Sequence, residues 1–192
     1  ELMAAQLVIE DTPEEVIGES ADRFAFRHAL TRQAVYFTML GRERRTLHRA
    51  VAETIEQQGS DSRLPELAYH FYTAGEWRKT WEYARRAGEQ AQTLYAPRAA
   101  VEHFTHALEA AHHLSQQNSD QAATYDTLPL YRARGQAYET LGEFEAARAD
   151  FEQGLTLAAT RQESKTEWQS LLDLGFLWTG RDFGRAEQHY QQ

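Results

Sequence analysis

The chain of 192 residues contains no cysteine, which excludes disulfide bonds and thiolate metal sites. This composition fits a reducing compartment, so we expect a cytoplasmic protein. No apolar run approaches the roughly 20 residues that a membrane-spanning helix needs, and the first residues lack the basic start and apolar core of a signal peptide. The chain also has no G-x-x-x-x-G-K-[ST] phosphate loop and no G-x-S-x-G nucleophile turn. We therefore expect no enzyme.

Charge is distributed unevenly along the chain. The net charge of −9 argues against nucleic-acid binding by the chain as a whole. Residues 1–22 contain seven acidic and no basic residues, whereas residues 23–49 contain seven arginines and one acid, Glu43. The first sixty residues therefore differ from the rest, while the content of 42% hydrophobic residues is enough for a packed core.

Residues 131–155 carry the most informative pattern. Small and aromatic residues recur there at the spacing of a tetratricopeptide repeat, a helix–turn–helix unit of about 34 residues: Gly135, Tyr138, Gly142, Phe144, Ala147, Phe151 and Leu155. Gly135 and Ala147 let two antiparallel helices approach closely, and Gly142 supplies the tight turn. One such unit cannot bury its own apolar face, so we expect neighbouring units and a scaffold that holds partners.

The same spacing predicts helix pairs on both sides of this unit. Three further sets of residues fit: Ala68, Phe71, Gly75 and Trp77, with Thr80 at the usual alanine; Gly88, Ala91, Ala100, Phe104, Ala107 and Leu108; and Gly175, Trp178, Phe183, Ala186 and Tyr190. Residues 77–94 fit either one long helix, which we favour, or two short helices with a kink near residues 87–88. We also expect a helix that opens at Pro97 and a lengthened polar loop at 113–127. The last unit starts near Ser164, and its halves are one residue out of register, which predicts a longer turn at 179–182.

Residues 1–60 predict a small α+β subdomain. Apolar and alternating residues favour short strands at 7–9 and 23–27. A helix should then begin near His28, and a second helix should end at Gly59. The predicted buried stripes consist of Leu30, Ala34, Phe37 and Leu40 in the first helix and of Leu47, Val51 and Ile55 in the second.

Three runs resemble the segment that follows the ATPase core in large bacterial STAND-type regulators. They are R-F-A-F-R-H-A-L-T-R-Q-A-V-Y at 23–36, R-E-R-R-T-L-H-R-A-V-A at 42–52 and L-A-Y-H-F-Y-T-A-G-E-W at 67–77. STAND proteins are P-loop ATPases, similar to AAA and NB-ARC modules, fused to LuxR-type or SARP-type DNA-binding domains or to nucleotide cyclases. In that family a winged-helix-like subdomain and then helical repeats follow the nucleotide-binding module.

The resemblance implies a mostly α fold in two parts. Residues 1–60 would form a winged-helix-like α+β subdomain that ends an ATPase module. Residues 61–192 would form tetratricopeptide-like repeats, a right-handed α-solenoid truncated at its C-terminus. The fragment would hold no cofactor, and ATP or ADP would bind to the parent protein.

His28 is the candidate cofactor-binding residue. In related switch ATPases, a histidine at a strand-to-helix junction contacts the β-phosphate of ADP. The run F-R-H-A-L at 26–30 resembles that motif, with Ala29 in place of the aspartate of the eukaryotic version. The resemblance implies that His28 senses nucleotide in the intact parent. The alternative is a histidine that caps or packs against its own helix.

Two other clusters have a functional and a structural interpretation. The basic residues Arg42, Arg44, Arg45, His48 and Arg49 suggest DNA binding, but also a solvated face or a docking surface for acidic residues 10–22. His106, Glu109 and His113 share a helix face, with His103 and His112 nearby. Residues seven apart on a helix are separated by roughly 10 Å, too far for one zinc ion. We therefore predict a polar face and no metal site.

Large aromatic residues are frequent, and we expect most of them to pack between helices while a few line a partner groove: Tyr69, Tyr72, Trp77, Trp81, Tyr83, Trp168 and Trp178. The expected function is a non-catalytic, signal-sensing interaction segment of a STAND-type regulator. Its partners would be a protein or peptide on the repeats and the upstream ATPase core, with no membrane and no nucleic acid. Two alternatives stay open, a free-standing tetratricopeptide adaptor and a winged-helix DNA-binding protein.

Overall fold

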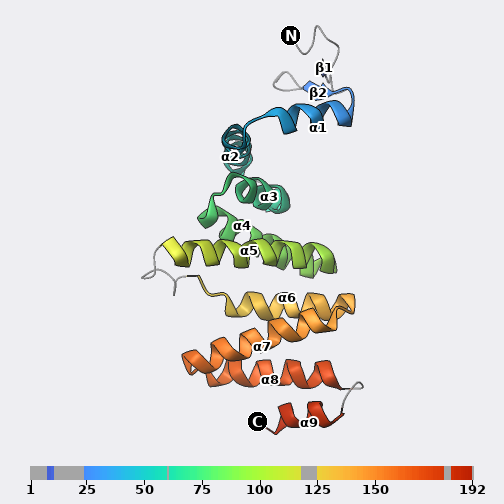
Figure 1. Cartoon of the computed structure of the whole chain (residues 1–192), viewed down its shortest axis with the longest axis vertical. Helices are drawn as coiled ribbons and strands as arrows, with labels where there is room; N and C mark the ends of the chain where they lie inside the picture. Colours follow the sequence, from blue (N-terminus) through green and yellow to red (C-terminus); the bar gives the residue numbers. More distant parts are fainter. Residues whose placement is uncertain (1–7, 11–23, 60, 118–124, 180–182, 192) are drawn as a thin grey trace. The chain divides into compact units, whose positions relative to one another are not determined.

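The protein is mostly α in the part that the computed structural model describes, residues 8–10, 24–59, 61–117, 125–179 and 183–191 (Figure 1). In chain order, its elements are β1 (Val8–Glu10), β2 (Phe24–Phe26), α1 (Ala29–Thr38), α2 (Gly41–Gln57), a short 3-10 helix (Asp61–Arg63), α3 (Leu64–Ala74), α4 (Trp77–Thr93), α5 (Pro97–Gln117), α6 (Leu128–Leu141), α7 (Phe144–Arg161), α8 (Ser164–Trp178) and α9 (Phe183–Tyr190).

Contacts divide the chain into two compact units, residues 1–47 and 48–192. The division lies inside α2, whereas the sequence placed a boundary at residue 60. It falls earlier because Ala52 and Ile55 are buried in one core with residues of α3, α4 and α5.

In the first unit, β1 and β2 form an antiparallel pair with Val8 opposite Phe26 and Glu10 opposite Phe24. Both predicted strands are confirmed to within one residue. The linker between them lies outside the described residues. α1 begins at Ala29, directly after His28, as the change from alternating to helical spacing predicted.

The predicted buried stripe of α1 is wrong. Leu30 and Phe37 are 79% and 64% exposed, Leu40 is exposed as well, and none of the ten residues of α1 is buried. Helical spacing shows that apolar side chains share a face, but burial also needs a neighbour that covers it. Among the described elements of the first unit, α1 has its principal contact with the short strand β2.

The buried stripe of α2 lies one residue away from the predicted position. Ile55 is buried as expected, but its companions are His48 and Ala52, while Leu47 and Val51 are exposed. Both sets fit helical spacing, since 47-51-55 and 48-52-55 advance by three or four residues. The sequence could not distinguish them without the position of α3.

In the second unit, each helix from α3 to α9 packs against the next, so that consecutive helices lie in layers (Figure 1). The expected single helix over residues 77–94 is confirmed as α4, and Pro97 opens α5. α5 continues to Gln117, so the first five residues of the predicted loop at 113–127 are helical instead. Buried Leu114 packs there with Tyr125, which stabilises the extra turn. Residues 118–124 and 180–182 lie outside the described part, so the longer turn at 179–182 stays a prediction.

Glycine ends two of these helices in the left-handed conformation. Gly75 has φ 77° after α3, and Gly142 has φ 76° after α6. In both turns the glycine N–H and the next N–H donate to carbonyl oxygens of the last helical turn, for example from Glu143 to Tyr138 at 2.9 Å. This double hydrogen bond satisfies carbonyl groups that the helix end leaves unpaired. The sequence prediction of both tight turns is confirmed.

Glycines in helix interiors let an aromatic ring lie directly on the backbone of the neighbouring helix. A Cβ atom added to Gly88 would lie 2.5 Å from Phe104, and one added to Gly135 would lie 2.6 Å from Phe151. Gly175 has the same relation to Tyr190. Three helix pairs, α4 with α5, α6 with α7 and α8 with α9, therefore share one packing arrangement.

A buried ion pair connects three of these helices. The Arg134 guanidinium of α6 donates to both carboxylate oxygens of Asp150 on α7, at 2.7 and 2.8 Å, and to the Thr105 hydroxyl of α5 at 3.0 Å. The side chains of Arg134 and Asp150 are 17% and 7% exposed. Bidentate pairing at this depth fixes the orientation of the helices, because loss of either partner would leave a buried charge unpaired.

We predict that Gly135→Ala destabilises the protein by about 1 to 3 kcal/mol, because the new methyl group would overlap with the Phe151 ring. Urea unfolding followed by circular dichroism measures the change. Gly154→Ala is the matched control, since its Cβ would meet only the Ser170 hydroxyl at an ordinary 3.5 Å. That control should be neutral or stabilising by up to about 1 kcal/mol. Equal stability of both variants would contradict the packing described.

Candidate partner-binding site

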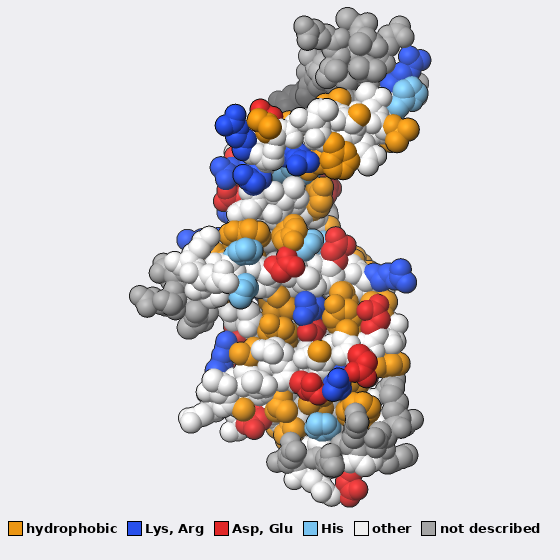
Figure 2. All heavy atoms as spheres, in the orientation of Figure 1, with side chains coloured by type: hydrophobic (Ala, Val, Ile, Leu, Met, Phe, Trp, Pro, Cys, Tyr) orange, Lys and Arg blue, Asp and Glu red, His pale blue; other side chains and the backbone are white. Residues whose placement is uncertain are grey.

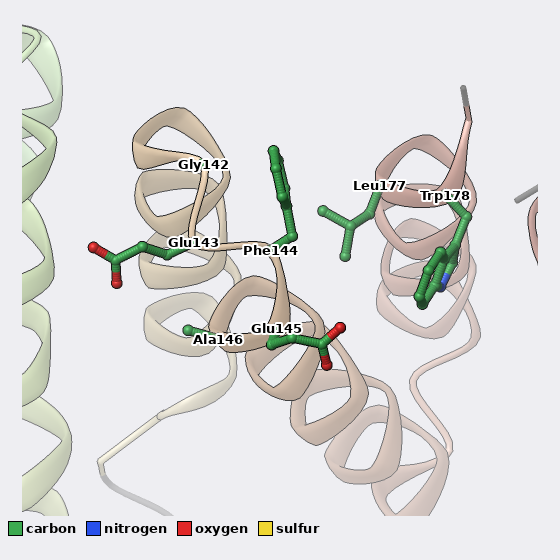
Figure 3. Close-up of a pocket in the computed structure, with 7 residues that line it drawn as sticks. All are labelled: Gly142, Glu143, Phe144, Glu145, Ala146, Leu177 and Trp178. Carbon is green, nitrogen blue, oxygen red and sulfur yellow. The ribbon is translucent and has the colours of Figure 1, made fainter. Parts of the chain in front are cut away.

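A pocket of about 450 Å³ lies between the α6–α7 turn and the C-terminal end of α8. Its lining residues are Gly142, Glu143, Phe144, Glu145, Ala146, Leu177 and Trp178. Figure 3 shows Leu177 pointing toward Phe144, with Trp178 beside it, while the Glu143 carboxylate points away. The pocket thus combines apolar walls with the Glu145 carboxylate at its edge.

A second pocket of about 260 Å³ lies between the α4–α5 turn and α6. It is lined by Gln92, Tyr95, Ala96, Pro97, Gln136, Ala137 and Thr140. Its walls come from the turn residues and Ala137, and its polar groups are amides and hydroxyls rather than carboxylates.

The two pockets occupy equivalent positions in successive helix pairs. Each lies between the turn of one pair and the first helix of the next. Ala137 stands two residues after Gly135, and Leu177 stands two residues after Gly175, so each pocket holds the residue at the same offset from its packing glycine. The pockets therefore repeat with the helix pairs along the edge formed by the turns.

Tyr95 stands at the rim of the second pocket in an unusual conformation. Its φ is 54° and it is 93% exposed. The left-handed region costs a residue with a Cβ roughly 1–2 kcal/mol. Because the ring is exposed, its burial offsets little of this free-energy cost. The sequence placed one helix before Tyr95 and the start of the next at Pro97, but it did not indicate that the tyrosine faces solvent. The positive φ is visible only in the structure.

The predicted histidine face of α5 is engaged in packing. His106 stacks on Tyr72 of α3 with ring centroids 3.8 Å apart, and His113 stacks on Trp77 of α4 at 4.1 Å. Glu109 accepts a hydrogen bond of 2.7 Å from the Tyr72 hydroxyl. Figure 2 shows several histidine side chains, in pale blue, on one face of the molecule. Among the described residues, no three metal-ligating side chains come together.

This packing shifts the pKa values of a tyrosine and two histidines. The hydrogen bond to Glu109, together with burial, raises the pKa of Tyr72 to about 12. Burial lowers the pKa of His106 and of His103, although nearby Glu102 acts in the opposite direction. The buried Nδ1 atoms of both histidines lack a hydrogen-bond partner. Both rings therefore favour the neutral form.

The five residues of the predicted basic patch do not form one exposed surface. His48 is buried, Arg49 forms an ion pair with Glu76, and Arg44 lies over the Tyr36 ring at 5.2 Å. Arg42 and Arg45 remain exposed. Of five basic residues, two are thus in place to contact a polyanion directly, which is few for a DNA interface.

His28 precedes α1, and its carbonyl oxygen accepts hydrogen bonds from the N–H groups of Thr31 and Arg32 at 3.1 and 3.2 Å. Its imidazole makes no capping hydrogen bond and the residue is exposed. The capping alternative is therefore wrong for the side chain. Nucleotide sensing by His28 in a parent protein stays a prediction.

Comparisons of the chain with protein-family models, with curated proteins and with solved structures give no match. In the described part of the chain, every helix is too short or too polar to cross a bilayer.

We predict that His106→Phe makes stability less dependent on pH. The folded-state pKa of His106 lies below its unfolded value of about 6.5, so the unfolded chain binds more protons as the pH falls below that value and stability decreases. Phenylalanine keeps the stack on Tyr72 and removes the titration. Urea unfolding at pH 7.5 and pH 5 should show a smaller loss than in the unsubstituted chain, by about 1.4 kcal/mol per unit of pKa depression. His112→Phe, at an exposed site of the same helix, is the control and should keep the original dependence.

Proposed function

We propose that this chain is a non-catalytic helical scaffold of the tetratricopeptide type that binds a partner protein through an extended segment. The observation that supports this function is the repetition of a pocket at equivalent positions of successive helix pairs. Two pockets on one edge suit a chain segment that places one side chain in each, because an extended peptide presents its side chains at regular intervals.

The linings favour a segment of mixed character. Phe144, Leu177 and Trp178 suit an aromatic or branched aliphatic side chain, and aromatic walls contribute strongly to interface energy. Glu145, which also lines this pocket, favours a lysine or arginine next to that side chain. A short basic and apolar sequence in a partner protein is therefore the expected ligand.

The resemblance to STAND-type regulators extends the proposal to a parent protein. There, the first unit would be a winged-helix-like subdomain that contacts an upstream ATPase core. The exposed Leu30 and Phe37 support this role, as does a pocket of about 420 Å³ whose lining includes Met39 and Leu47. Apolar surface of this kind is common where a protein meets a partner. A partner on the repeats would then change how this subdomain holds the ATPase core in a cytoplasmic bacterial regulator.

We predict that Trp178→Ala weakens binding of the partner segment at least tenfold, since a tryptophan in an apolar pocket typically contributes 2 kcal/mol or more. Peptides selected from a random library on the unsubstituted chain would be measured by fluorescence anisotropy. Tyr95→Ala tests the second pocket in the same assay, and both variants are first checked for unchanged circular dichroism. Trp168→Ala is the matched control, because Trp168 is 60% exposed on α8 and lines neither pocket. Selected peptides that bind both pocket variants as tightly as the control would exclude the turn edge as the site.

We predict that His28→Ala in the intact parent protein lowers ADP affinity, because an imidazole at a helix start can donate to a phosphate oxygen. Isothermal titration of ADP measures this, and the isolated chain should bind none. Unchanged ADP affinity in the parent would remove the sensing role of His28. A salt-dependent complex of the chain with duplex DNA would instead favour the winged-helix DNA-binding alternative.

A further inference from the structure

Two histidines meet where α2 packs on α3. The Nδ1 atom of His48 on α2 lies 2.9 Å from the Nδ1 atom of His70 on α3, a hydrogen-bond distance. Their ring centroids are 4.9 Å apart, and the Tyr69 ring lies edge-on to both at 5.6 and 5.2 Å. His48 is buried and His70 is half-buried. Both residues belong to the second unit.

Arginines outnumber carboxylates around this pair. Glu66 on α3 and Arg63 just before it face His70, and they form an ion pair with each other at 2.5 Å. On α2, Arg44 and Arg45 lie one turn before His48. Arg49 follows it and is paired with Glu76 at the start of α4. Burial lowers the pKa of His70, and this effect outweighs the attraction of Glu66.

Few other contacts hold this part of α2. Besides buried Ala52 and Ile55, Glu56 accepts hydrogen bonds from Lys79 and Tyr83 of α4, both at 2.5 Å. Although burial acts to raise it, these bonds hold the pKa of Glu56 below its usual value. Glu56 therefore stays ionised at mildly acid pH, so that its contacts do not weaken when histidines titrate.

The number of protons on the pair decides whether the contact can exist. With two neutral rings, one Nδ1–H donates to the other Nδ1. With one imidazolium, the charged ring donates the same hydrogen bond, which is then charge-assisted and stronger. With two imidazolium rings, both Nδ1 atoms carry hydrogens and positive charge, so they cannot stay 2.9 Å apart.

We propose that the His48–His70 pair is a proton-operated latch, which holds residues 48–57 of α2 on α3 and opens when the pair takes up its second proton. The latch does not depend on the identity of any partner of the turn-edge pockets. The two protons bind in coupled steps that belong to the pair. The folded contact disfavours the second proton, so the pKa of the second step lies below that of an ordinary histidine. The contact therefore stabilises the folded state at pH values above the ordinary histidine pKa. This stabilisation is lost as the pH falls through the second step.

Hydrogen exchange of the full chain between pH 7.5 and pH 5 tests the latch. Rates are corrected for intrinsic exchange, and EDTA is present to exclude metal bridging of the two imidazoles. We expect the protection of amides 48–57 to fall about tenfold more than that of α6 and α7, since one unit of pKa displacement corresponds to a factor of about ten. Residues 128–161 contain no histidine and serve as an internal reference.

The variant His70→Asn separates the latch from general acid sensitivity. The asparagine amide offers a donor and an acceptor near the position of Nδ1 and does not titrate, so protonated His48 can still donate to it. We expect residues 48–57 to keep their protection at pH 5 in this variant. His112→Asn, on the exposed face of α5, should behave like the unsubstituted chain. An equal acid-induced fall in His70→Asn, or no excess fall in the unsubstituted chain, would overturn the proposal.

Imidazole NMR of the unsubstituted chain gives a second test that needs no variant. The latch requires His48 and His70 to titrate in two separated steps, with the second below the ordinary histidine range. Independent titration of both rings with one common midpoint would equally overturn the proposal.

Discussion

Direct contact between a glycine and an aromatic ring of the next helix is the interaction on which the second unit depends. Phe104 follows Gly88 by 16 residues, Phe151 follows Gly135 by 16, and Tyr190 follows Gly175 by 15. Because no Cβ intervenes, each ring approaches the backbone and fixes the distance between its two helices. The same distance sets where each turn lies relative to the next pair. The spaces between turn and helix therefore repeat as well.

This interaction explains why the sequence predicted the second unit so well. Glycines and aromatics at fixed spacing are local signals, and Gly75, Gly142 and Pro97 mark helix ends through backbone conformation alone. The sequence also predicted that the two halves of the last unit are one residue out of register. The structure shows this offset, because Tyr190 contacts Gly175 at a spacing of 15 residues instead of 16. The pockets were not predictable, since each combines side chains from two helix pairs whose approach depends on tertiary packing.

The errors near the N-terminus have a different cause. In α2, two stripes fit helical spacing equally well, and in α1 none of the ten helical residues is buried. Periodicity does not indicate which face a neighbour will cover. His48 illustrates the consequence. Its sequence context of arginines favoured a solvated or DNA-binding face, yet α3 presents His70 to it and buries it. A charged neighbourhood in the sequence therefore does not determine the neighbourhood in space.

The contacts in the second unit differ in strength along the chain, and this difference indicates where conformational change begins. The Arg134–Asp150 pair is buried and bidentate, so opening α6 and α7 would expose an unpaired charge or require both helices to separate. By contrast, the ion pair of Arg49 with Glu76 is half exposed, and such pairs contribute at most about 1 kcal/mol. Local opening follows the weakest set of contacts. The proposed latch therefore places the first opening at residues 48–57 of α2, ahead of α6 and α7, and makes that opening depend on the protons of the His48–His70 pair.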